Sequence, residues 1–127
     1  MKVMKFGGTS VGKPERMQQV KELITRDHTP TLVVLSALSG TTNSLVEISQ
    51  SLSRGNKEEA KQRIDQLEAH YRTFVSNLLH QPATLEKGNQ VVSEHFEFLH
   101  IILRISFSEA LNKDILAQGE LLSTKLF

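Results

Sequence analysis

The segment KFGGTSVGKPE, from Lys5 to Glu15, follows a short apolar start and marks the first change of structure along the chain. Val3 to Phe6 predicts a short strand, and Gly7-Gly8 ends it. Gly7 to Lys13 matches the first seven positions of the phosphate-binding pattern G-x-x-x-x-G-K-[ST]. The eighth position is Pro14, which supplies neither the hydroxyl that binds Mg²⁺ nor a backbone N–H. The glycines therefore need an explanation other than a P-loop.

A βαβ unit surrounds this segment. Pro14 to about Arg26 predicts a helix, because proline suits the first helical position and the apolar residues recur on one face. The polar stretch from Asp27 to Pro30 ends that helix. Thr31 to Ala37, TLVVLSA, is continuously apolar and rich in β-branched residues, which predicts a parallel strand buried on both faces. Strand, helix and strand with short connections form a βαβ unit.

The rest of the chain predicts helices only. Thr41 or Thr42 is expected to cap a helix that ends near Leu52. Two longer helices joined by residues 81–88 predict an αα-hairpin. A last helix is expected to open at Asn112 and to run to the end of the sequence. Since a parallel sheet needs more than two strands and helices on both faces, we expect these residues to be the front part of a larger α/β domain, with the missing strands beyond Phe127.

The composition excludes several classes of function. Fifteen basic residues balance fourteen acidic ones, for a net charge of +1, so no nucleic-acid or membrane partner is expected. There is no cysteine, which excludes disulfides, thiolate metal ligands and a cysteine nucleophile. The charged start is too short for a signal peptide, and no apolar stretch is long enough to span a bilayer, so a cytoplasmic location is expected.

The five histidines predict no metal site. They stand at positions 28, 70, 80, 95 and 100 without the spacing of zinc ligands. We expect all five to lie on the surface or on the flanks of helices.

Two glycine turns are candidate binding sites. Gly7-Gly8 stands where a strand leads into a helix, where backbone N–H groups and the helix dipole attract anions. Lys5 interrupts the preceding strand, either as a solvent-facing residue or with its ammonium directed at an anion. The second turn, SALSGTTN from Ser36 to Asn43, has the same position after the next strand. The simpler alternatives are a tight turn and a helix-capping loop.

A third candidate is QGELLSTK, near the end of the sequence. Glu120 interrupts an apolar helical pattern directly after Gly119. A glycine within a helix costs about 1 kcal/mol relative to alanine and often has a packing or functional reason. An ordinary exposed glutamate is the alternative.

Together, KFGGTS, VVLSALSGTTNSL and QGELLSTKLF closely resemble the aspartokinases of the amino-acid kinase superfamily, in order along the whole chain. Related kinases for glutamate, N-acetylglutamate or UMP share the Gly-Gly turn but differ at the Thr-Ser and Thr-Asn positions. The resemblance implies an α/β fold, namely a three-layer α/β/α sandwich around a mostly parallel sheet. It also implies transfer of the ATP γ-phosphoryl group to the side-chain carboxylate of L-aspartate, the first step toward lysine, threonine and methionine.

The resemblance carries over to seven positions of this sequence. It implies a catalytic role for Lys5 and a path for the ATP phosphates along Lys5, Phe6, Gly7 and Gly8. It implies that Ser36, Thr42 and Glu120 bind L-aspartate, with Glu120 facing the substrate ammonium group. Mg²⁺ is expected to be held mainly through the nucleotide phosphates, with no metal ligand among residues 1–127 and no Mg²⁺ bound to these residues alone.

The resemblance also shows what these residues lack. The adenine pocket, an arginine for the substrate carboxylate, an aspartate near the phosphates and the regulatory ACT domains have no counterpart in residues 1–127. We therefore expect the chain alone to be inactive, and the full-length protein to be a homo-oligomer. Three alternatives stay open: an aspartokinase fused to homoserine dehydrogenase, a non-catalytic α/β module that binds phosphate or nucleotide, and a helical interaction domain built on the αα-hairpin.

Overall fold

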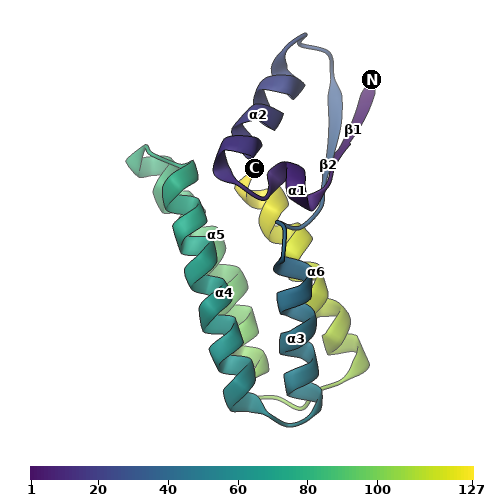
Figure 1. The fold of residues 1–127 in the computed structure, drawn as a ribbon, viewed down its shortest axis with the longest axis vertical. Helices are drawn as coiled ribbons and strands as arrows, with labels where there is room; N and C mark the ends of the chain where they lie inside the picture. The colour runs from purple at the N-terminus through teal and green to yellow at the C-terminus, as the bar shows by residue number, and fades with distance from the viewer.

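The computed structural model describes residues 1–127 as a βαβ unit that leads into a bundle of helices (Figure 1). The elements in chain order are β1 (Lys2–Phe6), α1 (Gly8–Val11), α2 (Pro14–Thr25), β2 (Thr31–Leu35), α3 (Thr41–Ser53), α4 (Lys57–Leu78), α5 (Pro82–Ile102) and α6 (Glu109–Leu126). None of these helices is long and apolar enough to cross a membrane.

The two strands confirm the predicted βαβ unit. β1 and β2 pair in parallel, with Val3 opposite Leu32 and Phe6 opposite Leu35. The connection contains α2, as predicted, and also the four-residue helix α1, which the sequence did not predict. The residues of α1 are Gly-Thr-Ser-Val, which have low helix propensity. This helix therefore depends on its packing, through the buried Val11.

The two faces of the sheet differ in their environment. Side chains alternate between faces along a strand. Phe6, Val33 and Leu35 face the core, and Leu35 is buried. On the opposite face Val3, Leu32 and Val34 are 65%, 53% and 43% exposed. The prediction that the second strand is buried on both faces was therefore wrong for this chain, because no helix of the chain covers the outer face.

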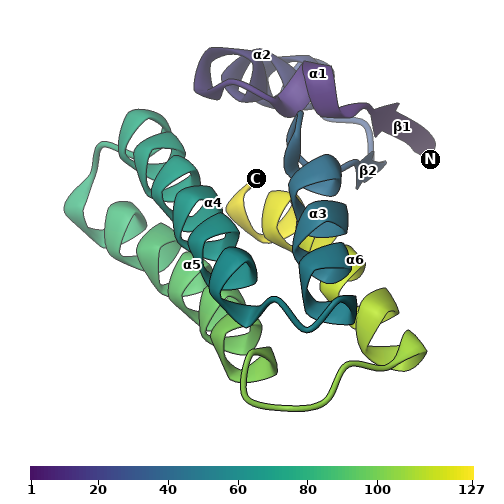
Figure 2. The same cartoon turned by 60° about the horizontal axis from the view of Figure 1, so that its bottom comes forward.

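Four helices, α3 to α6, pack below the sheet (Figures 1 and 2). α4 and α5 run side by side and confirm the predicted αα-hairpin. Its connection is shorter than the predicted 81–88, because α5 begins at Pro82, where a proline loses no helical hydrogen bond. α6 also begins before the predicted Asn112, since the Ser108 hydroxyl accepts a hydrogen bond from the Leu111 N–H at 3.2 Å.

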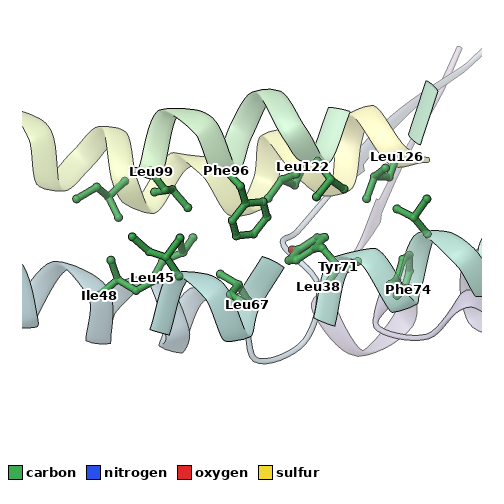
Figure 3. Close-up of a cluster of buried hydrophobic side chains, with 14 of the residues drawn as sticks. Leu38, Leu45, Ile48, Leu67, Tyr71, Phe74, Phe96, Leu99, Leu122 and Leu126 are labelled. Atoms are coloured by element: carbon green, nitrogen blue, oxygen red, sulfur yellow. The ribbon is translucent and has the colours of Figure 1, made fainter. Parts of the chain in front are cut away.

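A continuous hydrophobic core joins the βαβ unit to the bundle. It contains 22 buried residues from α1, α2, β2, the turn after β2 and all four bundle helices. Figure 3 shows its centre, where Tyr71 of α4 lies close to Phe96 of α5. Their ring centroids are 5.8 Å apart, with the ring planes tilted at 53°. The bundle therefore has its aromatic packing next to the turn that follows β2, at Leu38.

His95 contradicts the prediction that all five histidines lie on the surface or on the flanks of helices. Its side chain is only 7% exposed, and its Nδ1 lies 2.5 Å from the Gln118 Oε1 of α6. His95 stands three residues after Val92 and four before Leu99, so it occupies the buried face of α5. The hydrogen bond to Gln118 compensates for part of the cost of burying the ring.

Candidate functional site

The two glycine turns meet at the same end of the sheet. The Ser36 N–H donates to the Phe6 carbonyl at 3.0 Å, and the Ser39 N–H donates to the Gly8 carbonyl at 3.2 Å. These bonds extend the pairing of β1 and β2 past the ends of the strands. The turns predicted to bind phosphate and substrate are therefore neighbours, at the carboxyl ends of two parallel strands, where open α/β sheets bind ligands.

Gly8 makes the closest contact between the turns. A Cβ atom at this position would lie 2.8 Å from the Ala37 carbonyl oxygen and 3.4 Å from the Ser39 nitrogen. Both neighbours are backbone atoms, so neither can rotate away. Gly7 differs, because a Cβ there would meet nothing within 4 Å. Only the second glycine is required for the two turns to approach each other.

Lys5 lies on the outer face of the sheet, on the strand that leads into the first turn. It pairs in register with Val34, and its side chain is exposed. Its ammonium group has no hydrogen bond or ion pair within the chain, whereas Lys2 on the same strand pairs with Asp27. Of the two sequence interpretations, the structure shows the solvent-facing one, with the ammonium free to contact an anion.

The start of α3 differs from the predicted cap. Gly40, at φ 83°, precedes the helix, and neither threonine caps it with its side chain. Thr41 is the first helical residue, is 1% exposed, and shares a hydrogen bond of 2.8 Å with the Tyr71 hydroxyl. Thr42, the predicted substrate ligand, is exposed. The first turn of α3 thus has one threonine bound in the core and the next directed toward solvent.

α6 reaches the same end of the sheet. The Ser123 hydroxyl donates to the Ser36 carbonyl oxygen at 2.7 Å. Gly119 packs against the second turn, since a Cβ there would lie 2.8 Å from the Ala37 Cβ and 3.3 Å from the Thr41 Cγ2. Glu120 is the next residue and is exposed. The mid-helix glycine therefore has a packing reason, and it places Glu120 beside the turn that carries Ser36 and Thr42.

We expect Gly119→Ala to destabilise the chain. The added methyl group overlaps the Ala37 Cβ, which cannot rotate away, so we expect a cost of about 3 kcal/mol, in the upper part of the usual range for overpacking. The better helix propensity of alanine offsets ~1 kcal/mol of that cost. The double variant Gly119→Ala/Ala37→Gly removes the overlapping methyl group and is expected to recover part of the lost stability. Urea denaturation measures both variants, and a Gly119→Ala variant as stable as wild type would contradict the packing described here.

Tyr71, which lies in the core next to the second turn (Figure 3), has a raised pKa. Burial raises the pKa of Tyr71 from 10.0 to about 12, the Thr41 hydrogen bond opposes this rise, and the Glu120 carboxylate adds to it. The Glu120 carboxylate acts in this direction because a negative charge disfavours the tyrosinate form. The neutral phenol is therefore the form that the fold stabilises.

We expect an ultraviolet titration to show this shift directly. The chain has one tyrosine and no tryptophan, so tyrosinate absorbance reports on Tyr71 alone. The midpoint is expected at about 12 in the folded chain and at about 10 in urea. Because the folded pKa is the higher one, the stabilisation is complete below pH 10.0 and is lost as the pH rises toward 12. Glu120→Gln should lower the folded midpoint and Thr41→Val should raise it, and a folded midpoint near 10 would contradict the burial.

Two cavities adjoin the turns. One of about 270 Å³ lies between the start of α3 and the middle of α4, and its lining includes Ser39, Gly40, Arg63 and His70. Arg63 is already paired with Glu47 at 2.5 Å and with Glu59 at 3.0 Å. A larger cavity of about 550 Å³ lies between α1 and α2, and its lining includes Phe6. Neither cavity is lined by Lys5, Ser36, Thr42 or Glu120.

One group of side chains has the composition of a metal site, which the histidine spacing did not predict. Asp65 and Glu68 of α4 approach the His100 Nε2 of α5, at 3.6 Å and 3.4 Å. Arg72 also binds Glu68, at 3.2 Å. The group includes none of the predicted site residues, and its contacts join the two helices of the hairpin, beside the ion pair between Arg72 and Glu68.

Comparisons with known proteins agree with the sequence motifs. No protein-family model matches the chain. The chain is 31% identical to lysine-sensitive aspartokinase 3 of Escherichia coli (strain K12) over 125 residues, which is 98% of this chain and 27% of that protein. It is 37% identical to the chloroplastic aspartokinase 2 of Arabidopsis thaliana over 135 residues, 98% of this chain and 23% of that protein.

The solved structures that match are also aspartokinases. E. coli aspartokinase III in complex with lysine and aspartate, in the T-state, superimposes with a TM-score of 0.76 at 28% identity, over 99% of this chain and 27% of that one. The R-state of that enzyme, in complex with aspartate and ADP, gives a TM-score of 0.74. The chain spans about a quarter of the length of these proteins. By sequence and by fold, this chain is a homologue of the aspartokinases, with part of an α/β domain of the amino-acid kinase type.

Proposed function

We propose that this chain is the N-terminal portion of an amino-acid kinase catalytic domain, and that the longer polypeptide containing it phosphorylates the side-chain carboxylate of L-aspartate. The observation that carries the proposal is the meeting of three elements at one end of the sheet, namely the two turns and the part of α6 that bears Glu120. Two homologous structures contain aspartate, and one of them also contains ADP.

Lys5 and the first turn suit the phosphate side of the reaction. Phosphoryl transfer needs positioning and charge neutralisation more than covalent help from the protein. The free ammonium group of Lys5 can neutralise charge that develops on the transferring group, and the backbone N–H groups of Phe6, Gly7 and Gly8 can line the phosphate path. ATP is the phosphoryl donor in this proposal, with Mg²⁺ held mainly by its phosphates.

The second turn and α6 suit the amino acid. Ser36 and Thr42 offer hydroxyl groups to the substrate carboxylates. Glu120 has a negative charge that would repel both carboxylates and the nucleotide, so its favourable partner is the substrate ammonium group. In this arrangement the three residues hold the amino acid, and its side-chain carboxylate faces Lys5.

The proposed step is a single displacement at phosphorus. A side-chain carboxylate oxygen of L-aspartate forms the new bond to the γ-phosphorus, and the bond to the β,γ-bridging oxygen breaks. The products are 4-phospho-L-aspartate and ADP. No proton has to leave the nucleophile, because the carboxylate is already ionised, and no general base is therefore needed. The residues proposed here only bind, orient and neutralise charge.

The 127 residues alone are proposed to be inactive. They correspond to about a quarter of the matching aspartokinases, and the outer face of the sheet, which carries Lys5, is uncovered. We also propose that residues outside this chain supply the adenine pocket. The full-length protein is proposed to be a homo-oligomer located in the cytoplasm. This reaction would be the first step toward lysine, threonine and methionine.

Trapping of the product with hydroxylamine tests the proposal. The longer polypeptide is expected to give aspartyl hydroxamate from ATP and L-aspartate, and the 127-residue chain is expected to give none. A full-length protein that binds ATP without forming hydroxamate would favour a non-catalytic phosphate-binding module. If the longer polypeptide also oxidises homoserine, the bifunctional alternative is correct, and hydroxamate formation by the 127 residues alone would overturn the proposed inactivity.

A further inference from the structure

Each residue proposed to bind L-aspartate is next to a buried contact that fixes its place. The Ser36 carbonyl accepts a hydrogen bond from Ser123, and Glu120 follows Gly119, which is packed against Ala37. Thr42 follows Thr41, whose hydroxyl is bonded to Tyr71. Of these contacts, the one between Thr41 and Tyr71 joins side chains 30 residues apart in two helices. Tyr71 is not among the residues proposed to touch the substrate.

The Tyr71 side chain is rigidly held. It is 0% exposed, and its ring packs on Phe96 at a centroid distance of 5.8 Å (Figure 3). Its hydroxyl lies 2.8 Å from the Thr41 Oγ1, which is itself buried. A buried hydroxyl without a partner is costly, so both groups favour the arrangement in which they bond to each other.

The bond restrains the first turn of α3 at its first residue. Successive helical residues are 100° apart around the axis, as 3.6 residues per turn requires. With the Thr41 side chain bound in the core, Thr42 must point outward, where it is exposed. The start of α3 needs such a restraint, because Gly40 before it provides no side-chain cap.

We propose that Tyr71 is a positioning residue for the aspartate site, because its hydroxyl holds Thr41 and thereby orients Thr42 beside Glu120. This inference rests on the proposed function. Tyr71 does not touch the substrate, and its role is to keep a hydroxyl ligand in place before the amino acid arrives. Binding energy that would otherwise be spent on ordering the turn is then available for affinity.

Tyr71→Phe tests the inference, because it removes one oxygen atom and keeps the ring. In the longer polypeptide, KM for L-aspartate is expected to rise about 5-fold, which corresponds to loss of one typical hydrogen bond. The kcat and KM for ATP are expected to stay within about twofold of wild type, because the lost restraint affects ground state and transition state alike. A general loss of structure would instead lower the yield of active protein or change all three constants.

Two further variants at Thr41 complete the test. Thr41→Val removes the other half of the bond and is expected to raise KM for L-aspartate as Tyr71→Phe does, with no further rise in the double variant. Thr41→Ser keeps the hydroxyl and is expected to restore a KM close to wild type. These variants keep the inference testable if Tyr71→Phe fails to fold.

Ser51→Ala is the matched control. Ser51 is also 0% exposed, but its hydroxyl bonds only to the Glu47 carbonyl within α3. Loss of this buried hydroxyl is expected to leave KM for L-aspartate unchanged. If Ser51→Ala raises that KM as much as Tyr71→Phe does, the effect is not specific to the Thr41 bond and the inference is wrong.

The failure of this inference differs from failure of the proposed function. An unchanged KM for L-aspartate in Tyr71→Phe and Thr41→Val, with an active wild-type enzyme, would overturn the positioning role alone. A wild-type polypeptide that forms no aspartyl hydroxamate would overturn the proposed function and, with it, this inference.

Discussion

Lys5→Ala in the longer polypeptide is expected to lower kcat for aspartyl phosphate formation by about 100- to 1,000-fold, the range for loss of one preorganised group that stabilises transition-state charge. Lys5 is exposed on the outer face of the sheet and has no partner within the chain. Its removal therefore breaks no hydrogen bond or ion pair within the chain. The expected change in the free energy of unfolding is small, and the loss should appear in kcat.

Lys2→Ala is the control for this prediction. Lys2 lies on the same strand and is also exposed, but it pairs with Asp27. Its replacement removes a charge of the same sign from β1 without affecting the proposed phosphate site. Steady-state kinetics with the hydroxamate assay measure both variants. If Lys5→Ala and Lys2→Ala have the same kcat as wild type, Lys5 is not catalytic and the sheet end is a scaffold.

Gly8→Ala is expected to destabilise the chain by about 3 kcal/mol, the upper part of the usual range for overpacking. The new Cβ would lie 2.8 Å from the Ala37 carbonyl oxygen, a backbone atom in the opposite turn. Relief of this overlap requires the two turns to separate, which would strain the hydrogen bond from the Ser39 N–H to the Gly8 carbonyl. For a chain of this size the loss corresponds to a Tm lower by roughly 10 °C.

Gly7→Ala provides a matched control one residue away. A Cβ at Gly7 meets nothing within 4 Å, and the residue has φ −77°, which alanine adopts without strain. Such a substitution is expected to be neutral or to stabilise by about 0.5 kcal/mol, because it restricts the unfolded chain. Thermal denaturation followed by circular dichroism compares the two variants. Equal Tm values for both would show that the turns are not in contact.

The regular elements were largely predictable from the sequence because their signals are local. The β-branched run from Thr31, the proline at position 14 and the apolar stripe that includes Ile64 and Phe74 each determine structure within a few residues. One error occurred where distant packing decides, since Gly8–Val11 is helical despite its propensities. The other was a local signal that was overlooked, because Pro82 opens α5 as a proline at the first helical position can.

The site was predictable in part for the same reason. The two glycine turns lie together at one end of the sheet, as their positions after parallel strands indicated. No sequence signal placed the third motif, which α6 brings to the same end through the bond from Ser123 to Ser36. The role of the Tyr71 hydroxyl was missed because the ring fits the apolar stripe of α4. Burial of the ring alone is enough to explain a tyrosine at that position. The sequence pattern gives no sign that its hydroxyl meets Thr41. His95 was missed although its spacing from Val92 and Leu99 placed it on the buried face.

The uncovered outer face of the sheet bears both Lys5 and the exposed apolar residues Val3, Leu32 and Val34. Any further polypeptide that shields those valines and that leucine from water must also enclose the ammonium group beside them. Removal of water from that group strengthens its attraction for phosphate oxygens. In the enzyme proposed here, completing the hydrophobic layer and activating the lysine would consequently be a single structural event.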